Sequence, residues 1–398
     1  MPINGVELSM KAVVIAAGKG TRMQPLTLTT SKGMLPVANK PILQWTCEFL
    51  DFCDEIIIIV NENQRDIISH FLNNKKVQLR FQDEPLGTGH ALLQAEGIKG
   101  KFIVMYGDDV YGKEDIENIS KLNENAMSSF SSENPKIYGV IETKDEWVVG
   151  LEEKPKQPKS NLVNCGLYLF DESIFSYLKK ISISPRGEYE LTDAIKAMLA
   201  EGVKIKNHDV GVWIPLSYPW NILDANRYLL DKYRKNIHPS VELRPGAVIE
   251  DPVAIDAGSV IGPNCYIRKY SSIGKNCKVG QAVEIKNSIV MDNSFVSHLS
   301  YVGDSIIGRN CNVGGGTLFT NLRLDDKNVK MEINGVRVDS GRRKLGGIVG
   351  DNVKIGARVT IMPGKRIWPD IMVPACMTVN EDIKTEIPLS SFRQKSSE

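Results

Sequence analysis

Hydrophobic residues in the first half of the chain form short runs, separated by longer segments of mixed polarity. Several of these segments have the spacing of amphipathic helices. The alternation, from Lys11 to about Arg234, predicts an α/β layer fold with a mainly parallel, buried sheet. The expected strands are 12–16, 56–60, 102–106, 136–141 and 162–170. Ligands in such folds bind at the carboxyl ends of the strands, so functional residues are expected there. Residues before Met10 show no periodic pattern and are predicted to be a tail.

Past Pro239 the pattern changes, and an aliphatic residue recurs at every sixth position. The first series is Ile249, Ile255, Ile261, Ile267, Ile273, Val279 and Ile285. We expect the register to slip by four at Ile289 and to continue through Phe295, Tyr301, Ile307 and Val313. After an insertion the repeat resumes at Val349, Ile355, Ile361, Ile367 and Val373. This period predicts a left-handed parallel β-helix of hexapeptide repeats, in which aliphatic residues stack on one another from coil to coil. The predicted domains are therefore 10–235 and 240–390.

Composition narrows the class of protein without naming a function. The 398 residues are 42% hydrophobic and 24% charged, as in ordinary folded protein of two domains. The apolar run at 56–60 is too short to cross a bilayer, and the N-terminus lacks the pattern of a signal peptide, so a cytoplasmic protein is expected. Seven cysteines without paired spacing indicate reduced thiols. A net charge of +1 argues against nucleic-acid or membrane binding.

A glycine-rich segment follows the first expected strand. Gly18 and Gly20 leave room for backbone N–H groups to approach phosphate oxygens, while Arg22 and Lys32 supply positive charge. The spacing fits neither a Walker loop nor the dinucleotide-binding pattern. An ordinary strand-to-helix turn is the alternative, but the segment does not stand alone.

Carboxylates follow the strand expected at 102–106, in Gly107-Asp108-Asp109. Hard oxygen ligands at the carboxyl edge of a sheet suit Mg²⁺, which keeps most of its waters and bridges protein to substrate phosphates. Asp108 is the expected metal ligand. An Asp after a strand is more often a turn residue or a helix cap, and here its context decides for the metal.

With these residues, the segments 82–91, 153–155, 164–166 and 188–193 make the first half resemble the sugar-1-phosphate nucleotidylyltransferases, which have a Rossmann-like fold. The resemblance implies that Gln82, Gly87 and Thr88 hold a pyrimidine base. It further implies that Arg22 and Lys32 bind the triphosphate and the sugar phosphate, and that Asp108 binds Mg²⁺. The remaining implied sugar-binding residues are Gly139, Glu153 and Asn164.

One position departs from that family's pattern. Relatives often carry a second metal-binding Asp or Asn in the segment where this chain has Pro215. Asp209 or Asn221 is a possible substitute, and a metal held mainly by water and phosphate is the alternative.

Within the repeats, the segments 297–304 and 320–323 contain candidate site residues. The stretch from about Val248 to Trp368 resembles the acetyltransferase half of the bifunctional N-acetylglucosamine-1-phosphate uridylyltransferase/glucosamine-1-phosphate N-acetyltransferases. The insertion at 340–346 is similar to that of their archaeal branch. Attack of an amine on a thioester requires removal of a proton, and His298 is the expected general base. The acceptor-binding residues implied by the resemblance are Arg268, Lys286, Tyr301, Asn321, Lys327 and Lys330. Acetyl-CoA is the implied co-substrate, and basic residues at 342–344 and 365–366 either meet its phosphates or form a solvated surface. Relatives form trimers with sites between neighbours, so a homotrimer is expected.

Three functions follow. The first is a bifunctional enzyme that acetylates glucosamine 1-phosphate and then transfers a uridylyl group from UTP to the product, releasing pyrophosphate. The second keeps only nucleotidyl transfer, with dTTP and glucose 1-phosphate as possible substrates, and treats the β-helix as an oligomerisation scaffold. The third is a non-enzymatic regulatory subunit. The residue pattern favours the first, because the scaffold interpretation treats His298, Tyr301 and Asn321 as coincidence.

Overall fold

A computed structural model describes residues 10–233 and 236–386, so the tail predicted before Met10 lies outside the described residues. The described chain divides into two compact units. The first unit holds residues 10–19, 32–34 and 42–215. The second holds residues 20–31, 35–41, 216–233 and 236–386. The predicted domain ends at 235 and 390 fall outside the described residues, and those bounds remain predictions.

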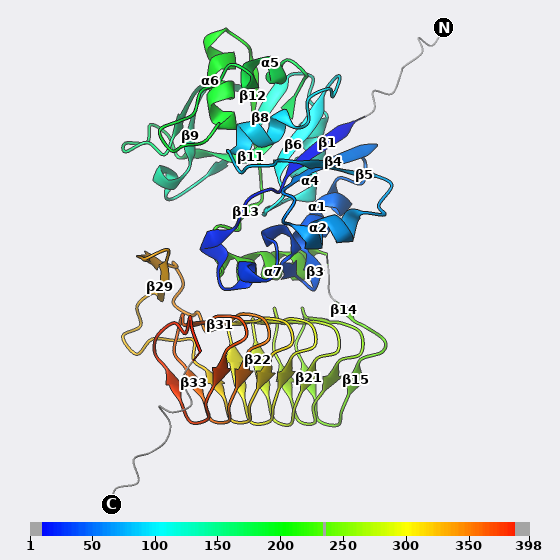
Figure 1. Cartoon of the computed structure of the whole chain (residues 1–398), viewed down its shortest axis with the longest axis vertical. Helices are drawn as coiled ribbons and strands as arrows, with labels where there is room; N and C mark the ends of the chain where they lie inside the picture. The colour runs from blue at the N-terminus through cyan, green and yellow to red at the C-terminus, as the bar shows by residue number, and fades with distance from the viewer. Residues whose placement is uncertain (1–9, 234–235, 387–398) are drawn as a thin grey trace, which may run out of the picture. The chain divides into compact units, whose positions relative to one another are not determined.

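The first unit is an α/β fold around a nine-stranded sheet (Figure 1). The strand order is β5-β4-β1-β6-β11-β8-β12-β10-β9. The strands are β1 (Lys11–Ile15), β4 (Glu55–Val60), β5 (Val77–Phe81), β6 (Phe102–Tyr106), β8 (Asn125–Ser131), β9 (Gly139–Lys144), β10 (Trp147–Glu153), β11 (Leu162–Phe170) and β12 (Ile205–Asp209). β5, β4, β1 and β6 are parallel, whereas β11 runs antiparallel to both β6 and β8. The α/β prediction is confirmed, and the sheet is mixed beyond its parallel part.

Helices pack against this sheet because the strands present apolar side chains on the faces that the helices cover. Val13, Ile57 and Val104 share one buried cluster with Ala91 and Ile195 from two helices. The helices of this unit are α1 (Ile42–Phe49), α2 (Arg65–Phe71), α3 (Thr88–Leu93), α4 (Lys113–Ser120), α5 (Ile174–Leu178) and α6 (Leu191–Ala200). A short antiparallel pair, β7 (Asp109–Tyr111) with β13 (Trp213–Pro215), lies beside the main sheet.

The strand expected at 136–141 was placed too early. Pro135–Ile137 forms a 3-10 turn, η4, and β9 begins only at Gly139. Proline lacks the N–H that a strand ladder needs, and its fixed φ suits the start of a helical turn. The other four expected strands are present within one residue of their predicted starts.

The second unit is built on a left-handed parallel β-helix, whose stacked coils are seen edge-on in Figure 1. Three seven-stranded sheets form its sides. The first sheet contains β14 (Asn236–Ile237), β17 (Ala254–Ile255), β20 (Ser272–Ile273), β23 (Ile289–Val290), β26 (Ile306–Ile307), β31 (Ile348–Val349) and β34 (Arg366–Ile367). The second contains β15 (Glu242–Leu243), β18 (Val260–Ile261), β21 (Lys278–Val279), β24 (Phe295–Val296), β27 (Asn312–Val313), β32 (Lys354–Ile355) and β35 (Met372–Val373). The third contains β16 (Val248–Ile249), β19 (Tyr266–Ile267), β22 (Glu284–Lys286), β25 (Tyr301–Gly303), β28 (Leu318–Phe319), β33 (Thr360–Ile361) and β36 (Thr378–Val379).

The register predicted after Ile285 was wrong by one residue. Val290, Val296 and Val302 enter the core, whereas Phe295 is 39% exposed and Tyr301 is half-buried. The reason is a corner of five residues in place of six, so that Ile273 stacks on Val290 in the next coil. From Ile307 onward the predicted core positions are confirmed. Burying one such aliphatic side chain per corner contributes about 1.5–3 kcal/mol each, which favours this register strongly.

Two segments from the N-terminal half belong to the second unit. Residues 20–31 contain the 3-10 turns η1 (Thr21–Met23) and η2 (Leu26–Leu28), and residues 35–41 contain β2 (Pro36–Val37) and β3 (Lys40–Pro41). The hydroxyl of Thr29 donates to Asp351 (2.8 Å), and Arg309 donates to the Thr30 hydroxyl (2.6 Å). Helix α7 (Asn221–Lys232) contacts the second of these segments through Asn226, whose Oδ1 accepts from the backbone N–H of Ala38 (2.8 Å).

A hairpin of β29 (Lys330–Ile333) and β30 (Val336–Asp339) forms the insertion between β28 and β31. In the described residues, no helix is long and apolar enough to cross a membrane. All seven cysteines are free thiols, and six are buried.

Candidate functional sites

A lysine and an aspartate meet at the carboxyl end of β6. Lys32, at the start of η3 (Lys32–Met34), forms an ion pair with Asp108 at 2.5 Å. The lysine side chain is 11% exposed and the aspartate 34%, so the carboxylate faces solvent and can accept a further ligand. Gly107, between β6 and Asp108, has no room for a side chain, because a Cβ atom would lie 2.7 Å from Leu43 and Val14.

Asp109 has a structural role beside this pair. Its Oδ2 accepts from the indole N–H of Trp213 (3.0 Å), and its partner in the β7–β13 ladder is Pro215. Pro215, at the position expected for a second metal ligand, therefore lies opposite the neighbour of Asp108, and proline offers no side-chain donor atom there.

Asp209 is too distant to be that second ligand. It ends β12, and two strands, β11 and β8, separate β12 from β6. At about 4.8 Å per strand the lateral separation is about 14 Å. Asp209 also accepts from Ser129 (2.5 Å) and Asn207 (2.7 Å). Asn221 accepts from the backbone N–H of Tyr218 (2.9 Å). No group of three or more potential metal-binding side chains occurs in the described part of the chain.

Arg22 lies in η1 and belongs to the second unit. Its guanidinium carbon is 5.7 Å from the centre of the Tyr218 ring, a cation–π contact that orients an otherwise exposed side chain. Gly20, immediately before η1, has φ 63°, a conformation that favours glycine. Gly18 has open space around it.

The residues expected to hold a base converge at the start of α3. The Gln82 amide is buried, and its nitrogen donates to the carbonyl of Gly87 (3.1 Å). Gly87 has φ 108°, and a Cβ atom there would lie 2.6 Å from the carbonyl oxygen of Tyr189. The hydroxyl of Thr88 accepts from the backbone N–H of Leu191 (3.2 Å), so the 188–193 segment is tied to this loop.

The residues expected to hold a sugar meet across β9, β10 and β11. Gly139 pairs with Glu153 in the β9–β10 ladder, and a Cβ atom on Gly139 would lie 2.9 Å from Glu153 Oε2 and 3.6 Å from Asn164. The absence of a side chain at Gly139 keeps the carboxylate and amide accessible from one side. Asn164 donates to the hydroxyl of Tyr168 (2.7 Å).

Two further groups of this site were not predicted from the sequence. Arg186 contacts Glu153 (3.3 Å) and forms a double hydrogen bond with Glu190 (2.8 and 2.5 Å). Burial acts to raise the pKa of Glu190, but the hydrogen bonds from Arg186 and Ser184 hold it below its usual range. Tyr106 hydrogen-bonds with Tyr168 and Thr88, and burial raises its pKa to about 12. This phenol therefore links, as a neutral group, the residues expected to hold the base and those expected to hold the sugar.

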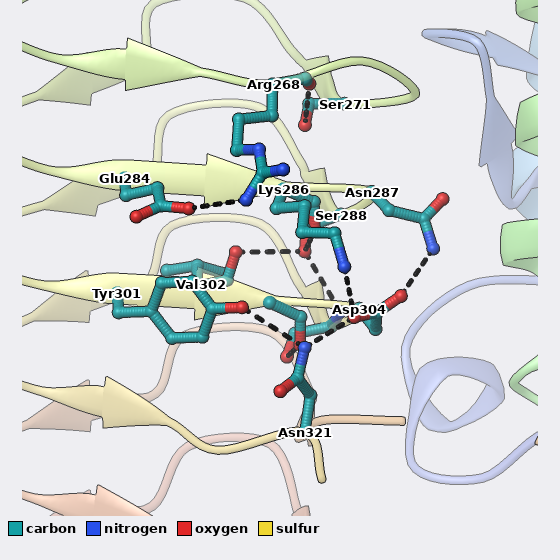
Figure 2. Close-up of polar contacts among 12 residues, drawn as sticks. Arg268, Ser271, Glu284, Lys286, Asn287, Ser288, Tyr301, Val302, Asp304 and Asn321 are labelled. Atoms are coloured by element: carbon teal, nitrogen blue, oxygen red, sulfur yellow. Dashed lines mark hydrogen bonds and ion pairs between the residues drawn. The ribbon is translucent and has the colours of Figure 1, made fainter. Parts of the chain in front are cut away.

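The β-helix carries a second polar cluster, at the corner between β25 and β26 (Figure 2). The Asn321 amide donates to the hydroxyl of Tyr301 (3.1 Å) and to Asp304 (2.5 Å). Lys286, one coil away, lies 3.6 Å from Asp304. Gly303 allows these side chains to meet, because a Cβ atom there would lie 2.3 Å from the Tyr301 hydroxyl and 2.6 Å from the Asn321 amide nitrogen. Arg268 pairs with Glu284 (3.1 Å) beside them.

His298 lies at the preceding corner, between β24 and β25. Its exposed ring lies over Gly315 of the next coil, where a Cβ atom would approach the imidazole to 2.9 Å. In the described chain the ring makes no hydrogen bond to the Tyr301 cluster. The six residues from His298 to Asp304 span up to about 20 Å of extended chain.

The structure does not bring the two insertion lysines into this cluster. Lys330 lies 3.9 Å from Asp339 in the β29–β30 hairpin and lines a cavity of about 580 Å³ together with Arg337, Lys365 and Lys384. The backbone N–H of Lys327 donates to Asp325 (3.4 Å).

Three of the basic residues at 342–344 and 365–366 form ion pairs within the chain. Arg366 is 4% exposed and binds Asp382 with two nitrogens (2.9 and 2.6 Å), so it is unavailable for the phosphates of acetyl-CoA. Arg342 binds Asp224 (2.5 Å) and Arg343 binds Asp326 (2.6 Å). Lys344 is exposed and Lys365 is half-buried.

Comparisons with known proteins agree with both halves of this picture. Residues 11–231 match the family model described as nucleotidyl transferase, and residues 249–383 match the GMPPB C-terminal domain. The bifunctional protein GlmU of Methanocaldococcus jannaschii is 42% identical, with 94% of this chain and 96% of that protein covered. The bifunctional sugar-1-phosphate nucleotidylyltransferase/acetyltransferase of Sulfurisphaera tokodaii is 39% identical, with 94% and 98% covered. The chain belongs to this bifunctional family.

A solved structure adds independent support for the fold of the first half of this family member. A Bacillus anthracis chain, studied as a candidate glucose-1-phosphate thymidylyltransferase in complex with sucrose, superposes with a TM-score of 0.51 at 28% identity. It covers 57% of this chain and 98% of its own length. A more distant relative, the low-salt glycan biosynthesis nucleotidyltransferase Agl11 of Haloferax volcanii, is 32% identical over 78% of this chain and 95% of its own.

Proposed function

We propose that this protein makes UDP-N-acetylglucosamine in two steps. The β-helix transfers an acetyl group from acetyl-CoA to glucosamine 1-phosphate, and the α/β unit transfers a uridylyl group from UTP to the product, releasing pyrophosphate. The observation that carries the proposal is that each unit has its own polar site: Lys32 with Asp108 in the first, and Tyr301 with Asn321 in the second. A relative named for both activities and another named as bifunctional match over almost the whole chain.

In the nucleotidyl step, a phosphate oxygen of the sugar 1-phosphate attacks the α-phosphorus of UTP, and the bond to pyrophosphate breaks. Lys32 stabilises the charge that develops on the transferring phosphoryl group, and Arg22 is assigned the same role. Mg²⁺, when bound at Asp108, would neutralise the phosphate oxygens. Gln82 donates its amide N–H groups internally, which leaves its oxygen to accept from the N3–H of uracil or thymine.

In the acetyl step, His298 takes a proton from the amine as the nitrogen attacks the thioester carbonyl. The carbon–sulfur bond then breaks, and the departing sulfur takes that proton from His298, so coenzyme A leaves as the thiol. Lys286 and Tyr301 bind the acceptor phosphate by charge and hydrogen bonding, with Arg268 and Asn321 beside them. Lys344 and Lys365 are the basic residues left to meet the phosphates of acetyl-CoA.

We further propose a cytoplasmic homotrimer. In one chain His298 and the Lys286 corner lie at opposite ends of a coil side, so a neighbouring copy can supply groups that complete the acceptor site. Lys327 and Lys330, on the insertion, are the residues proposed for that contribution. Sedimentation equilibrium tests the trimer directly.

The deciding experiment measures two products from the purified protein. Thiol release from acetyl-CoA should require glucosamine 1-phosphate, and pyrophosphate release from UTP should require N-acetylglucosamine 1-phosphate. Pyrophosphate release without thiol release would favour a nucleotidylyltransferase with a scaffold β-helix, and dTTP with glucose 1-phosphate would then be assayed. Absence of both products would leave the regulatory-subunit interpretation.

A further inference from the structure

One corner of the β-helix departs from the hexad repeat in three successive coils. It is the corner that follows β22, β25 and β28, and it carries the proposed acceptor site. Core residues are six positions apart along most of the repeat, but Ile285 is followed by Val290, and Val302 by Ile307. β22 and β25, which precede these short corners, have three residues where most strands of the β-helix have two. In the next coil the same corner gives rise to the β29–β30 insertion.

Asp304 occupies the centre of this irregular corner. It is 5% exposed, although an aspartate is rarely buried unless it is paired. Its Oδ1 accepts from the Asn287 amide (2.7 Å), and its Oδ2 accepts from the Asn321 amide (2.5 Å). The three residues are spaced 17 apart, so they stack in one column of successive coils, as Figure 2 shows.

The donor and acceptor roles in these hydrogen bonds fix the direction in which the Tyr301 hydroxyl proton points. An amide nitrogen has two protons: Asn321 gives one to Asp304 and the other to the Tyr301 oxygen. The phenolic proton of Tyr301 is then left to point away from Asn321. Burial and the nearby charge of Asp304 raise the pKa of Tyr301, so this proton is retained at neutral pH.

A second column on the β-helix, at a different corner, contains hydrogen bonds of the same type. Asn310 donates to Asn352 (3.1 Å), and Asn352 donates to Asp370 (2.9 Å). Asp370 is exposed, whereas Asp304 is buried beside Lys286 at 3.6 Å. The same Asn-to-Asp bond therefore occurs in both columns, in different surroundings.

We propose that Asp304 is a positioning residue of the acetyl-acceptor site: its carboxylate fixes Asn321 so that Tyr301 donates its proton to the sugar phosphate, and it holds Lys286 beside the same anion. This inference rests on the proposed function, because it takes the sugar 1-phosphate as the ligand of Tyr301 and Lys286.

The first variant is Asp304→Asn, which keeps size and removes one acceptor. Asn287 and Asn321 donate to different oxygens of Asp304, and the substituted amide has an NH2 group in place of one of them, so either Asn287 or Asn321 loses its present acceptor. We expect the KM for glucosamine 1-phosphate and its Kd from isothermal titration calorimetry to rise about tenfold or more. The kcat of acetyl transfer should change less, and pyrophosphate release from UTP should not change.

The double variant Asp304→Asn/Asn321→Asp separates positioning from folding. The new amide at position 304 can then accept from Asn287 and donate to the new carboxylate at position 321, so every group of the column is satisfied. The Tyr301 hydroxyl now donates to that carboxylate, away from the ligand. We expect the melting temperature to return to that of the wild type while KM and Kd stay raised. The matched control is Asp370→Asn, which changes the same type of bond in the other column and should leave KM and Kd unchanged.

Several results would overturn the positioning role: a KM and Kd within twofold of the wild type in Asp304→Asn, recovery of both constants in the double variant, or an equal loss in Asp370→Asn. Calorimetry needs no turnover, so the two proposals fail separately. A wild type that binds the sugar phosphate without releasing thiol contradicts the proposed acetyl transfer. A wild type that fails to bind it overturns both.

Discussion

Lys32 and Asp108, the ion pair of the first unit, are 76 residues apart in sequence, whereas Asn287, Asp304 and Asn321 in the β-helix are 17 residues apart. The first pair meets because η3, which begins at Lys32, lies against the carboxyl end of β6, which Asp108 follows. The second group meets because each coil repeats the path of the one before. A sheet edge gathers residues from distant segments, and a β-helix makes neighbours from a fixed spacing. The two sites therefore share no residue, and a substitution in one should spare the other.

The largest separation of the two activities is expected from Asp108→Ala. Loss of the carboxylate removes the proposed Mg²⁺ ligand and leaves Lys32 without its partner, so pyrophosphate release from UTP should fall about 10³-fold or more. Thiol release from acetyl-CoA by the same preparation is the internal control and should be unchanged. Retention of Mg²⁺-dependent pyrophosphate release would show that the metal assignment is wrong.

The next largest effect is expected from His298→Ala, which should impair acetyl transfer and spare nucleotidyl transfer. Without a general base, thiol release should fall about 10²–10³-fold, while pyrophosphate release stays at the wild-type rate. The matched control is His238→Ala, which removes another histidine from a β-helix corner, one that contacts Ser240 (2.9 Å). If His298→Ala acetylates normally, another base performs the step.

A smaller effect, confined to acceptor binding, is expected from Gly303→Ala. The added methyl group would lie 2.3 Å from the Tyr301 hydroxyl, so this side chain must move away from Asn321. We expect the KM for glucosamine 1-phosphate to rise about tenfold, with the KM for UTP as the control. An unchanged acceptor KM would mean that Tyr301 does not bind the sugar phosphate.

The fold was largely predictable because each half follows one period. The predicted β-helix is confirmed, yet its register after Ile285 was wrong where Ile289 and Val290 are both aliphatic. Periodicity cannot tell which of two adjacent apolar residues faces inward when a corner loses one residue. At 136–141, the apolar residues led to a predicted strand, although Pro135 begins a turn there.

The sites were predictable only in part. Asp108 follows an expected strand and is brought together with Lys32, and Gly139, Glu153 and Asn164 lie close to one another. Arg186 was missed because its contacts with Glu153 and Glu190 depend on how a loop returns to the sheet. Asp304 was missed because Gly-Asp is typical of a turn. Its spacing of 17 from Asn287 and Asn321 would have indicated a column, once the coil was known to be one residue short.

The segment 20–31, which carries Arg22, bears on how this protein can be recombined with its relatives. Its Thr29 and Thr30 bind Asp351 and Arg309, and Arg366 donates to the Gln24 carbonyl (3.1 Å). A chimaera joined near residue 235 would exchange these β-helix partners while keeping the native 20–31 segment. A junction near residue 235 is thus a poor crossover point, and a functional exchange of β-helices must carry residues 20–31 along with the coils that hold them.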